Sequence, residues 1–196
     1  MPANTHTPEQ ASASNSSVMC YADALTAAMD HLGQDPRVVF LGQAVAVPGT
    51  AMFGTLKNIP LNRRIELPVE EDMQMGMSIG LALKGAIPVS IFPRWNFLLL
   101  AANQLVNHLD KMSELCPGTI PPKVIVRTSI GSERPLHPGP QHVGDHTEAF
   151  RAMCPHIEIV RLEEAADIVP AYARALARPD GKSTLLVEYG DYYNEK

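Results

Sequence analysis

Three acidic residues, Glu70, Glu71 and Asp72, stand together at the start of a segment that is otherwise almost wholly apolar as far as Gly85. A carboxyl group held among apolar residues can give and take protons during catalysis. Acidic residues are also common in the first turn of a helix, where the helix dipole stabilises negative charge. The segment alone therefore leaves both a proton-handling role and a purely structural role open.

Two further groups of chemically useful side chains follow apolar runs that read as strands. Phe92, Trp95 and Phe97 come at the end of one such run, and His137 and His142 lie in a long loop after the next. In a parallel sheet the carboxyl ends of the strands lie at one edge, where ligands bind. We therefore expect these side chains near the acidic cluster. Aromatic residues in such a position also often belong to a protein core, so that interpretation stays open.

Metal and nucleotide sites find little support in the sequence. The long loop also contains His146, and three histidines could suggest a metal site, but no acid or cysteine is spaced to complete a ligand set. The three cysteines lie far apart with no CxxC pair, which favours free thiols. The chain also has no GxGxxG or Walker sequence. We expect no metal site and no dinucleotide site within this chain.

The elements that must position these side chains alternate between strands and helices. Strands are expected over 37–42, 64–67, 87–92, 123–128, 157–162 and 183–190. Helices are expected over 19–32, 71–85, 96–113, 147–153 and 163–177. The strand segments are continuously apolar, which is typical of strands buried on both faces. The pattern predicts an α/β fold, a three-layer sandwich with a mostly parallel central sheet covered by helices on both faces.

Length and composition indicate a single globular domain. The chain has 196 residues, of which 45% are hydrophobic, and we expect a disordered tail over 1–17 followed by one domain over 18–196. A net charge of −5 without a basic patch argues against nucleic acid as a partner. No apolar run reaches the roughly 18 residues that cross a membrane, and the N-terminus has no signal-like core. We expect a cytoplasmic protein without a membrane segment.

Four stretches in this order resemble one known family. They are YADALTAAMDHLGQDPRVVFLGQAV from residue 21, LPVEEDMQMGMSIGLAL from 67, FPRWNFLLLAANQLVNHLDKM from 92 and GPQH from 139. From Tyr21 to about Tyr189 the chain resembles the pyrimidine-binding domain of the transketolase-like thiamine diphosphate enzymes. The closest resemblance is to the beta subunit of 2-oxo-acid dehydrogenase decarboxylating components. The resemblance therefore implies a cofactor, thiamine diphosphate, whose aminopyrimidine ring lies on this domain.

The resemblance also implies roles for particular residues. Glu71 matches the glutamate that hydrogen-bonds a ring nitrogen and exchanges a proton with it, because Gly76 and Gly80 follow it as the motif requires. Such an exchange works best if the carboxyl is desolvated. We expect Glu71 to be catalytic as well as cofactor-binding.

Further site residues come from the same resemblance. It implies that Phe97 packs against the pyrimidine, with Pro93 and Leu100 on the same wall. His142 matches the histidine that faces the substrate, where it would orient the substrate or stabilise charge. His137 could assist it.

Two departures from the family imply a partner. In relatives, diphosphate and magnesium are bound by a separate domain with a GDG sequence and a later asparagine, which this chain lacks. The family's third, C-terminal domain also has no counterpart here. We expect a diphosphate-binding alpha-like subunit that holds most of the magnesium site, in an assembly of two chains of each kind.

The expected reaction is cleavage or formation of a carbon–carbon bond next to a carbonyl group. A 2-oxo acid undergoing decarboxylation with acyl transfer is the first expectation. Ketol transfer from a ketose, as in transketolase, is the alternative within the family. A non-catalytic binding or regulatory homologue is the alternative from a different class of protein.

Other residues could modify this chemistry. Gln43 stands where beta subunits commonly have an acid, which could alter proton traffic or subunit contacts. Arg127 and Arg134 could bind an anionic substrate, although solvated surface positions are the commoner fate of arginine. The loop over 129–146 could set the choice of substrate.

Overall fold

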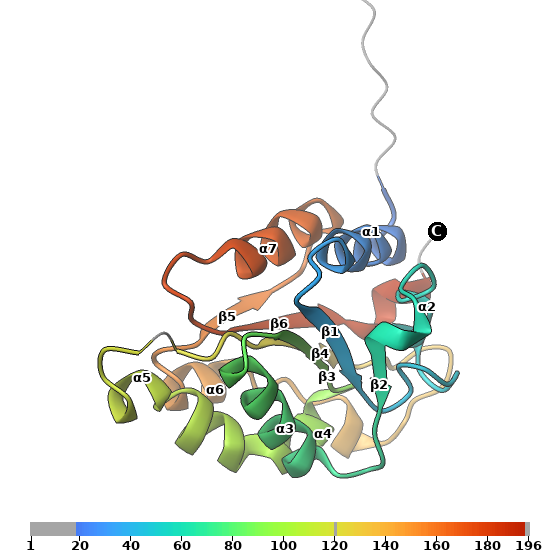
Figure 1. Cartoon of the computed structure of the whole chain (residues 1–196). Helices are drawn as coiled ribbons and strands as arrows, with labels where there is room; N and C mark the ends of the chain where they lie inside the picture. The colour runs from blue at the N-terminus through green and yellow to red at the C-terminus, as the bar shows by residue number, and fades with distance from the viewer. Residues whose placement is uncertain (1–18, 120, 195–196) are drawn as a thin grey trace, which may run out of the picture.

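A central sheet of six strands organises the computed structural model, which describes residues 19–119 and 121–194 (Figure 1). The expected tail over 1–17 lies outside the described residues. The strand order is β2-β1-β3-β4-β6-β5, and every adjacent pair is parallel. The strands are β1 (Val38–Gly42), β2 (Arg64–Glu66), β3 (Ile87–Ile91), β4 (Ile125–Ile130), β5 (Glu158–Arg161) and β6 (Thr184–Tyr189). The predicted α/β class is confirmed, with a sheet that is parallel throughout.

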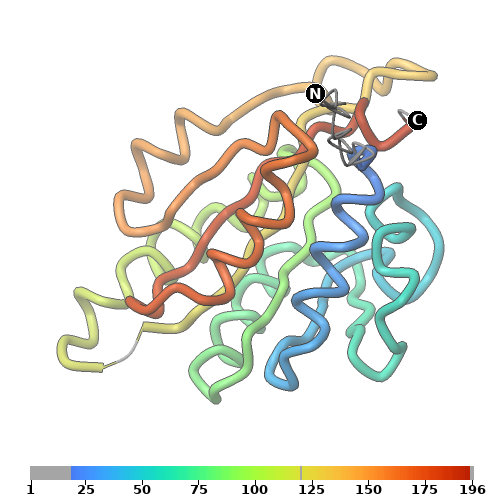
Figure 2. Tube along the Cα trace, turned by 90° about the horizontal axis from the view of Figure 1, so that it is seen from above, coloured from blue at the N-terminus to red at the C-terminus, as the bar shows by residue number. Residues whose placement is uncertain are grey.

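Helices cover both faces of this sheet (Figure 1). The helices are α1 (Tyr21–Gly33), α2 (Ala51–Gly54), α3 (Glu71–Leu83), α4 (Trp95–Leu98), α5 (Met112–Leu115), α6 (Thr147–Met153) and α7 (Ala165–Ala177). Helices α1 and α7 pack against each other over one face, as the view from above also shows (Figure 2). Helices α3 to α6 lie on the other face. Among residues 19–119 and 121–194, no helix is long and apolar enough to cross a membrane.

Each face of the sheet has its own hydrophobic core. Successive strand residues point to opposite faces. On β6, for example, Leu186 belongs to the core beneath α1 and α7, whereas Leu185 and Val187 belong to the core beneath α3 to α6. The continuous apolar runs in the sequence are therefore explained by burial of both strand faces.

The single helix expected over 96–113 is wrong. Helix α4 passes into a 3-10 turn at Leu99–Ala101, then into a π-helical segment at Gln104–Leu109, and α5 completes the run. The Asp110 N–H donates to the carbonyl of Leu105, five residues back, at 2.9 Å. Apolar residues spaced three and four apart mark a buried helix face in all of these forms, so the spacing could not distinguish them.

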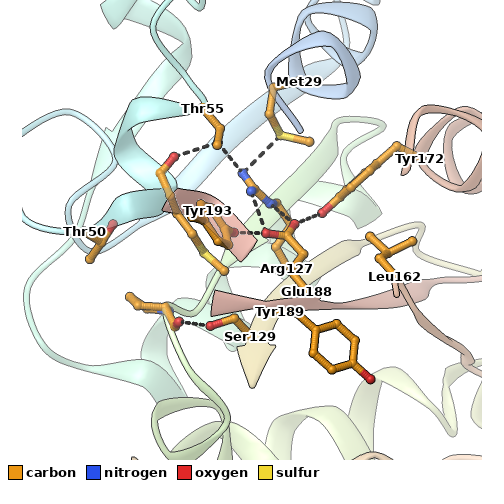
Figure 3. Close-up of polar contacts among 12 residues, drawn as sticks. Met29, Thr50, Thr55, Arg127, Ser129, Leu162, Tyr172, Glu188, Tyr189 and Tyr193 are labelled. Atoms are coloured by element: carbon orange, nitrogen blue, oxygen red, sulfur yellow. Dashed lines mark hydrogen bonds and ion pairs between the residues drawn. The ribbon is translucent and has the colours of Figure 1, made fainter. Parts of the chain in front are cut away.

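A buried ion pair joins β4 to β6 (Figure 3). Arg127 Nε donates to Glu188 Oε1 at 2.7 Å, and Nη2 donates to Oε2 at 2.9 Å. Both side chains have no solvent exposure. The hydroxyls of Tyr172 and Tyr193 donate to the same carboxylate, and Arg127 Nη1 donates to Thr55 Oγ1 at 3.2 Å. This cluster ties two central strands, α7 and the C-terminal residues into one unit.

Charge balance stabilises the ionised form of this cluster. Burial by itself lowers the pKa of Arg127, but the Glu188 carboxylate outweighs that effect and leaves the pKa well above its ordinary value. Burial, reinforced by Glu188, raises the pKa of the Tyr172 and Tyr193 hydroxyls well above the usual range, so both remain donors. The expectation that Arg127 binds an anionic substrate or lies on the surface is wrong, because its guanidinium is fully occupied inside the protein.

We expect Arg127→Met to lower the free energy of unfolding by about 3–5 kcal/mol, because it leaves a buried carboxylate without its cation. Urea denaturation at neutral pH measures the loss. Arg37→Met is the matched control, since Arg37 pairs with Asp35 at 2.7 Å on the surface, and it should cost less than about 1 kcal/mol. A loss of that small size for Arg127→Met would show that the buried pair does not hold the strands together.

Candidate active site at the carboxyl ends of the central strands

A cavity of about 630 Å³ lies at the carboxyl ends of four adjacent strands, β1, β3, β4 and β6. Its lining includes Gln43 after β1, Pro93, Arg94 and Phe97 after β3, Ser129 at the end of β4, His142 in the following loop, and Gly190 and Tyr193 after β6. The chain order reverses between β1 and β3, which is where parallel sheets usually bind ligands. The cavity therefore occupies the place in the fold where a small-molecule site is expected.

Only one carboxyl of the acidic cluster is buried. Glu71 is the first residue of α3 and is 4% exposed, whereas Glu70 and Asp72 are exposed. Glu70 occupies the N-cap position without a side-chain capping bond. Gln43 Nε2 donates to Glu71 Oε1 at 3.0 Å and is the only hydrogen-bond donor to this carboxyl among the described residues. Because Gln43 also lines the cavity, it connects Glu71 to the cavity wall.

The three residues predicted to contact a ring are divided between two places. Pro93 and Phe97 are half-buried and line the cavity. Leu100 is 61% exposed and is not part of the lining. A contact between Leu100 and a bound ring therefore stays a prediction, and it would have to form outside the cavity as this chain shapes it.

His142 lines the cavity and is oriented by a residue that the sequence reasoning missed. Its Nδ1 lies 3.1 Å from Oδ1 of Asn96. An amide oxygen can only accept, so Nδ1 carries the hydrogen and the neutral imidazole keeps its free lone pair on Nε2. The imidazole and the Phe97 ring lie with their centroids 6.0 Å apart. Asn96 stands one residue before Phe97, but nothing in its spacing indicates a partner 46 residues later.

The other loop histidines lie elsewhere. His137 is exposed, accepts a hydrogen bond from the Gly139 N–H at 3.1 Å, and places Nε2 3.5 Å from Glu133. The rings of His146 and Trp95 are nearly perpendicular, with centroids 6.1 Å apart. Across the described ranges 19–119 and 121–194, no group of three or more His, Cys, Asp or Glu side chains could hold a metal ion.

The long loop after β4 is fastened to the end of the chain. Asp191 Oδ1 accepts hydrogen bonds from the N–H groups of Glu133 and Arg134, each at 3.0 Å, and Arg134 Nε lies 3.5 Å from the same oxygen. Figure 2 shows this yellow loop beside the red C-terminal segment. Ser129 Oγ donates to the Pro93 carbonyl at 2.7 Å, which links the ends of β4 and β3 (Figure 3). These contacts fix the distance between the two loops that frame the cavity.

Glu66 holds the loop that follows Gln43. Its carboxylate accepts four backbone N–H bonds, of 2.6 to 3.2 Å, from consecutive residues 44–47. Ala44 has a φ of 52°, a left-handed conformation that is uncommon for a residue with a Cβ. Burial acts to raise the pKa of Glu66, but the four N–H groups outweigh it and lower the pKa below 4.5. The anionic form of Glu66 thus stabilises this loop.

Comparison with known proteins agrees with the fold and with the motifs. The profile described as "Transketolase, pyrimidine binding domain" matches residues 17–193. The beta subunit of the pyruvate dehydrogenase E1 component of Drosophila melanogaster is 28% identical over 169 residues, covering 83% of this chain and 45% of that protein. Its Caenorhabditis elegans counterpart is 30% identical over 155 residues, covering 77% and 43%. The chain thus spans less than half the length of these two relatives.

Solved structures share the fold. A split-gene transketolase, described as an inactive beta4 tetramer, superimposes with a TM-score of 0.66 at 17% identity, over 88% of this chain and 52% of that chain. Transketolase from Leishmania mexicana superimposes with a TM-score of 0.67 at 21% identity, over 88% and 25%. At such identities the likeness concerns the fold alone.

We expect Glu66→Gln to be less stable than the wild type at pH 7, because a neutral amide replaces a carboxylate that satisfies four N–H groups. The folded-state pKa is lowered, so the contribution of the anion is complete above pH 4.5 and is lost as the pH falls through the folded pKa. Urea denaturation of both variants from pH 7 to pH 3 should therefore show their difference shrinking toward zero in acid.

The control for this experiment is Glu164→Gln. Glu164 is an exposed carboxyl at the N-cap of α7 that makes no side-chain capping bond. Its replacement makes the same change in charge and should leave a small difference at every pH. A difference for Glu66→Gln that stays constant down to pH 3 would contradict the role assigned to the anion.

Proposed function

The chain belongs to the transketolase pyrimidine-binding domain family, and from this premise we propose that it is the pyrimidine-binding subunit of a split thiamine diphosphate-dependent enzyme. The enzyme would cleave or form a carbon–carbon bond next to a carbonyl group, most simply in 2-oxo acid decarboxylation with acyl transfer. One observation carries the proposal: a buried carboxyl, Glu71, connects through Gln43 to a cavity that Pro93 and Phe97 line.

The residues present fit the pyrimidine end of this cofactor. Pro93 and Phe97 offer apolar surface against which a flat ring packs, and the Glu71 carboxyl has a partner on Oε1 only. Oε2 is therefore the atom at which Glu71 would hold and exchange a proton with a ring nitrogen. When bound, thiamine diphosphate supplies the nucleophilic carbon and the electron sink for the reaction.

Gln43 affects this proton exchange through its chemistry. An amide donates a hydrogen bond to Glu71 without competing for the proton, whereas a second carboxyl 3.0 Å away would share the proton and couple the two groups. The glutamine that departs from the family pattern thus leaves Glu71 as the one carboxyl of this hydrogen-bonded pair.

His142 would act on the substrate side. Asn96 fixes the ring so that Nε2 is free, and the imidazole contacts Phe97 on the cavity wall. In that orientation Nε2 can hydrogen-bond a substrate hydroxyl, or donate to a carbonyl oxygen when protonated.

The diphosphate end of the cofactor requires a partner. A metal–diphosphate site needs several carboxylate or carbonyl ligands, and the described residues contain no group of acidic or metal-ligating side chains that could provide it. An alpha-like, diphosphate-binding subunit would supply this half together with most of the magnesium site, in an assembly of two chains of each kind. The relatives that are beta subunits support this organisation.

Ketol transfer between sugars is the second candidate reaction, because the family to which the chain belongs is described by the name of transketolase. The same residues would serve it, because both reactions would need the pyrimidine end of the cofactor to be held by this chain beside a substrate carbonyl group. Assays of the assembled enzyme with a 2-oxo acid and with a ketose phosphate distinguish the two reactions. A non-catalytic homologue would bind the partner and the cofactor and consume neither substrate.

We expect Glu71→Ala and Glu71→Gln to reduce turnover by at least about 100-fold when the chain is combined with a partner that carries the Gly-Asp-Gly sequence, thiamine diphosphate and magnesium. Glutamine keeps the shape of the side chain but cannot exchange the proton. Substrate consumption is the measurement, and Glu70→Gln, at the exposed neighbouring position, is the matched control that should retain activity. Full activity of Glu71→Ala, or an inactive wild-type assembly that still binds the cofactor, would contradict the proposal that this chain is an enzyme subunit.

A further inference from the structure

The cavity wall contains one charged side chain, Arg94. The other described residues that line the cavity are uncharged or histidine, and no aspartate or glutamate is among them. Arg94 is half-buried, yet its guanidinium has no hydrogen-bond or ion-pair partner within residues 19–119 and 121–194. Five N–H donors at the edge of a cavity without acids form a place for an anion.

Other arginines with little exposure behave differently. Arg63 and Arg64 donate to backbone carbonyls, Arg127 pairs with Glu188, Arg161 with Asp145 and Arg178 with Asp180. A cation removed from water is costly unless its charge and donors are satisfied. At Arg94, by contrast, the donors have no partner among residues 19–119 and 121–194, so they are free for a ligand in the cavity.

We propose that Arg94 binds the anionic group of the substrate, either the carboxylate of a 2-oxo acid or the phosphate of a ketose phosphate. This inference rests on the proposed function and adds the charge of the substrate and the residue that recognises it. The planar guanidinium matches either group through two parallel hydrogen bonds. The chain carries a net charge of −5, so a local cation is needed to attract such a substrate.

The position of Arg94 relative to the rest of the site is fixed by its own backbone. The Arg94 carbonyl accepts hydrogen bonds from the N–H groups of Phe97 at 3.1 Å and Leu98 at 3.3 Å. Pro93 and Phe97 on the same short segment line the cavity, and Asn96 orients His142. One five-residue stretch therefore carries the surface for the ring, the support for the histidine and the cation. A substrate whose anionic group binds Arg94 would have its reactive carbonyl carbon held near these groups.

Binding to the full chain can be measured without cofactor or partner. The ¹⁵N–¹H signals of the arginine Nε–H groups are recorded while pyruvate, inorganic phosphate or 3-hydroxybutan-2-one is added. The hydroxyketone is close to pyruvate in size but has no charge. We expect the signal that is absent from Arg94→Gln to shift with pyruvate, with phosphate or with both, and not with the hydroxyketone. Equal shifts with the hydroxyketone, or no shift with either anion, would overturn the proposal.

The assembled enzyme gives the second measurement. We expect Arg94→Gln to raise KM for the anionic substrate by about tenfold or more, and to change kcat/KM for the neutral 3-hydroxybutan-2-one much less. Arg94→Lys keeps the positive charge but lacks the two parallel donors of the guanidinium, and its KM should lie between those of the wild type and Arg94→Gln. Pyruvate and fructose 6-phosphate, tested in parallel, separate a carboxylate site from a phosphate site. An unchanged KM for both substrates in Arg94→Gln would overturn the proposal.

Arg174→Gln is the matched control. Arg174 lies exposed on α7 and, like Arg94, has no side-chain partner among the described residues, so the change in net charge is the same. It should alter neither the anion titration nor KM. Thermal unfolding of Arg94→Gln should match the wild type, because no described group loses a partner. If the wild-type assembly is inactive but pyruvate or phosphate still shifts the Arg94 signal, the proposed reaction fails and the anion site stands.

Discussion

All six strands run in the same direction, and this constraint determines where the rest of the molecule can place its chemistry. Each connection must return across the sheet, so helices cover both faces and the strands become buried on both sides. Every strand also releases the chain at the same edge. Four segments that are far apart in the sequence therefore meet there, namely those that follow β1, β3, β4 and β6. Together they enclose the cavity. A sheet with antiparallel strands would divide the same residues between two edges.

The charges around this edge are satisfied in clearly different ways. Glu188 pairs with the Arg127 cation and accepts hydrogen bonds from two tyrosine hydroxyls. Glu66 accepts hydrogen bonds from four backbone N–H groups. Both carboxylates are structural, because their partners are complete. Glu71 has only a neutral amide as its partner, and Arg94 has none among the described residues. An ionisable group without a full set of hydrogen-bond or ion-pair partners is costly in a folded protein, and such groups tend to occur where a ligand supplies the partner. Arg94 lines the cavity, and Glu71 is joined to the cavity wall through Gln43.

The short segment from Pro93 to Phe97 shows how one stretch can serve two purposes. Trp95 is fully buried in the core beneath α3 to α6, where it contacts Phe150 with ring centroids 5.0 Å apart. Its neighbours on either side have another role: Arg94 lines the cavity and Asn96 supports His142. The core residue fixes the segment, and the residues around it are then free to contact a ligand. Rigid support of this kind keeps a binding site in its working geometry.

The sequence by itself determined the class of fold. Continuous apolar runs specified strands buried on both faces, and the spacing of Gly76 and Gly80, matched to the family motif, singled out Glu71, which is the buried carboxyl of the three. These features are local, so a linear pattern records them. Only the tertiary structure decided that Arg127 pairs with Glu188, that Asn96 orients His142, that Glu66 holds residues 44–47 and that Arg94 lacks a partner. Each of these facts depends on which distant segments the parallel sheet brings together, and residue spacing along the chain carries no information about such pairs.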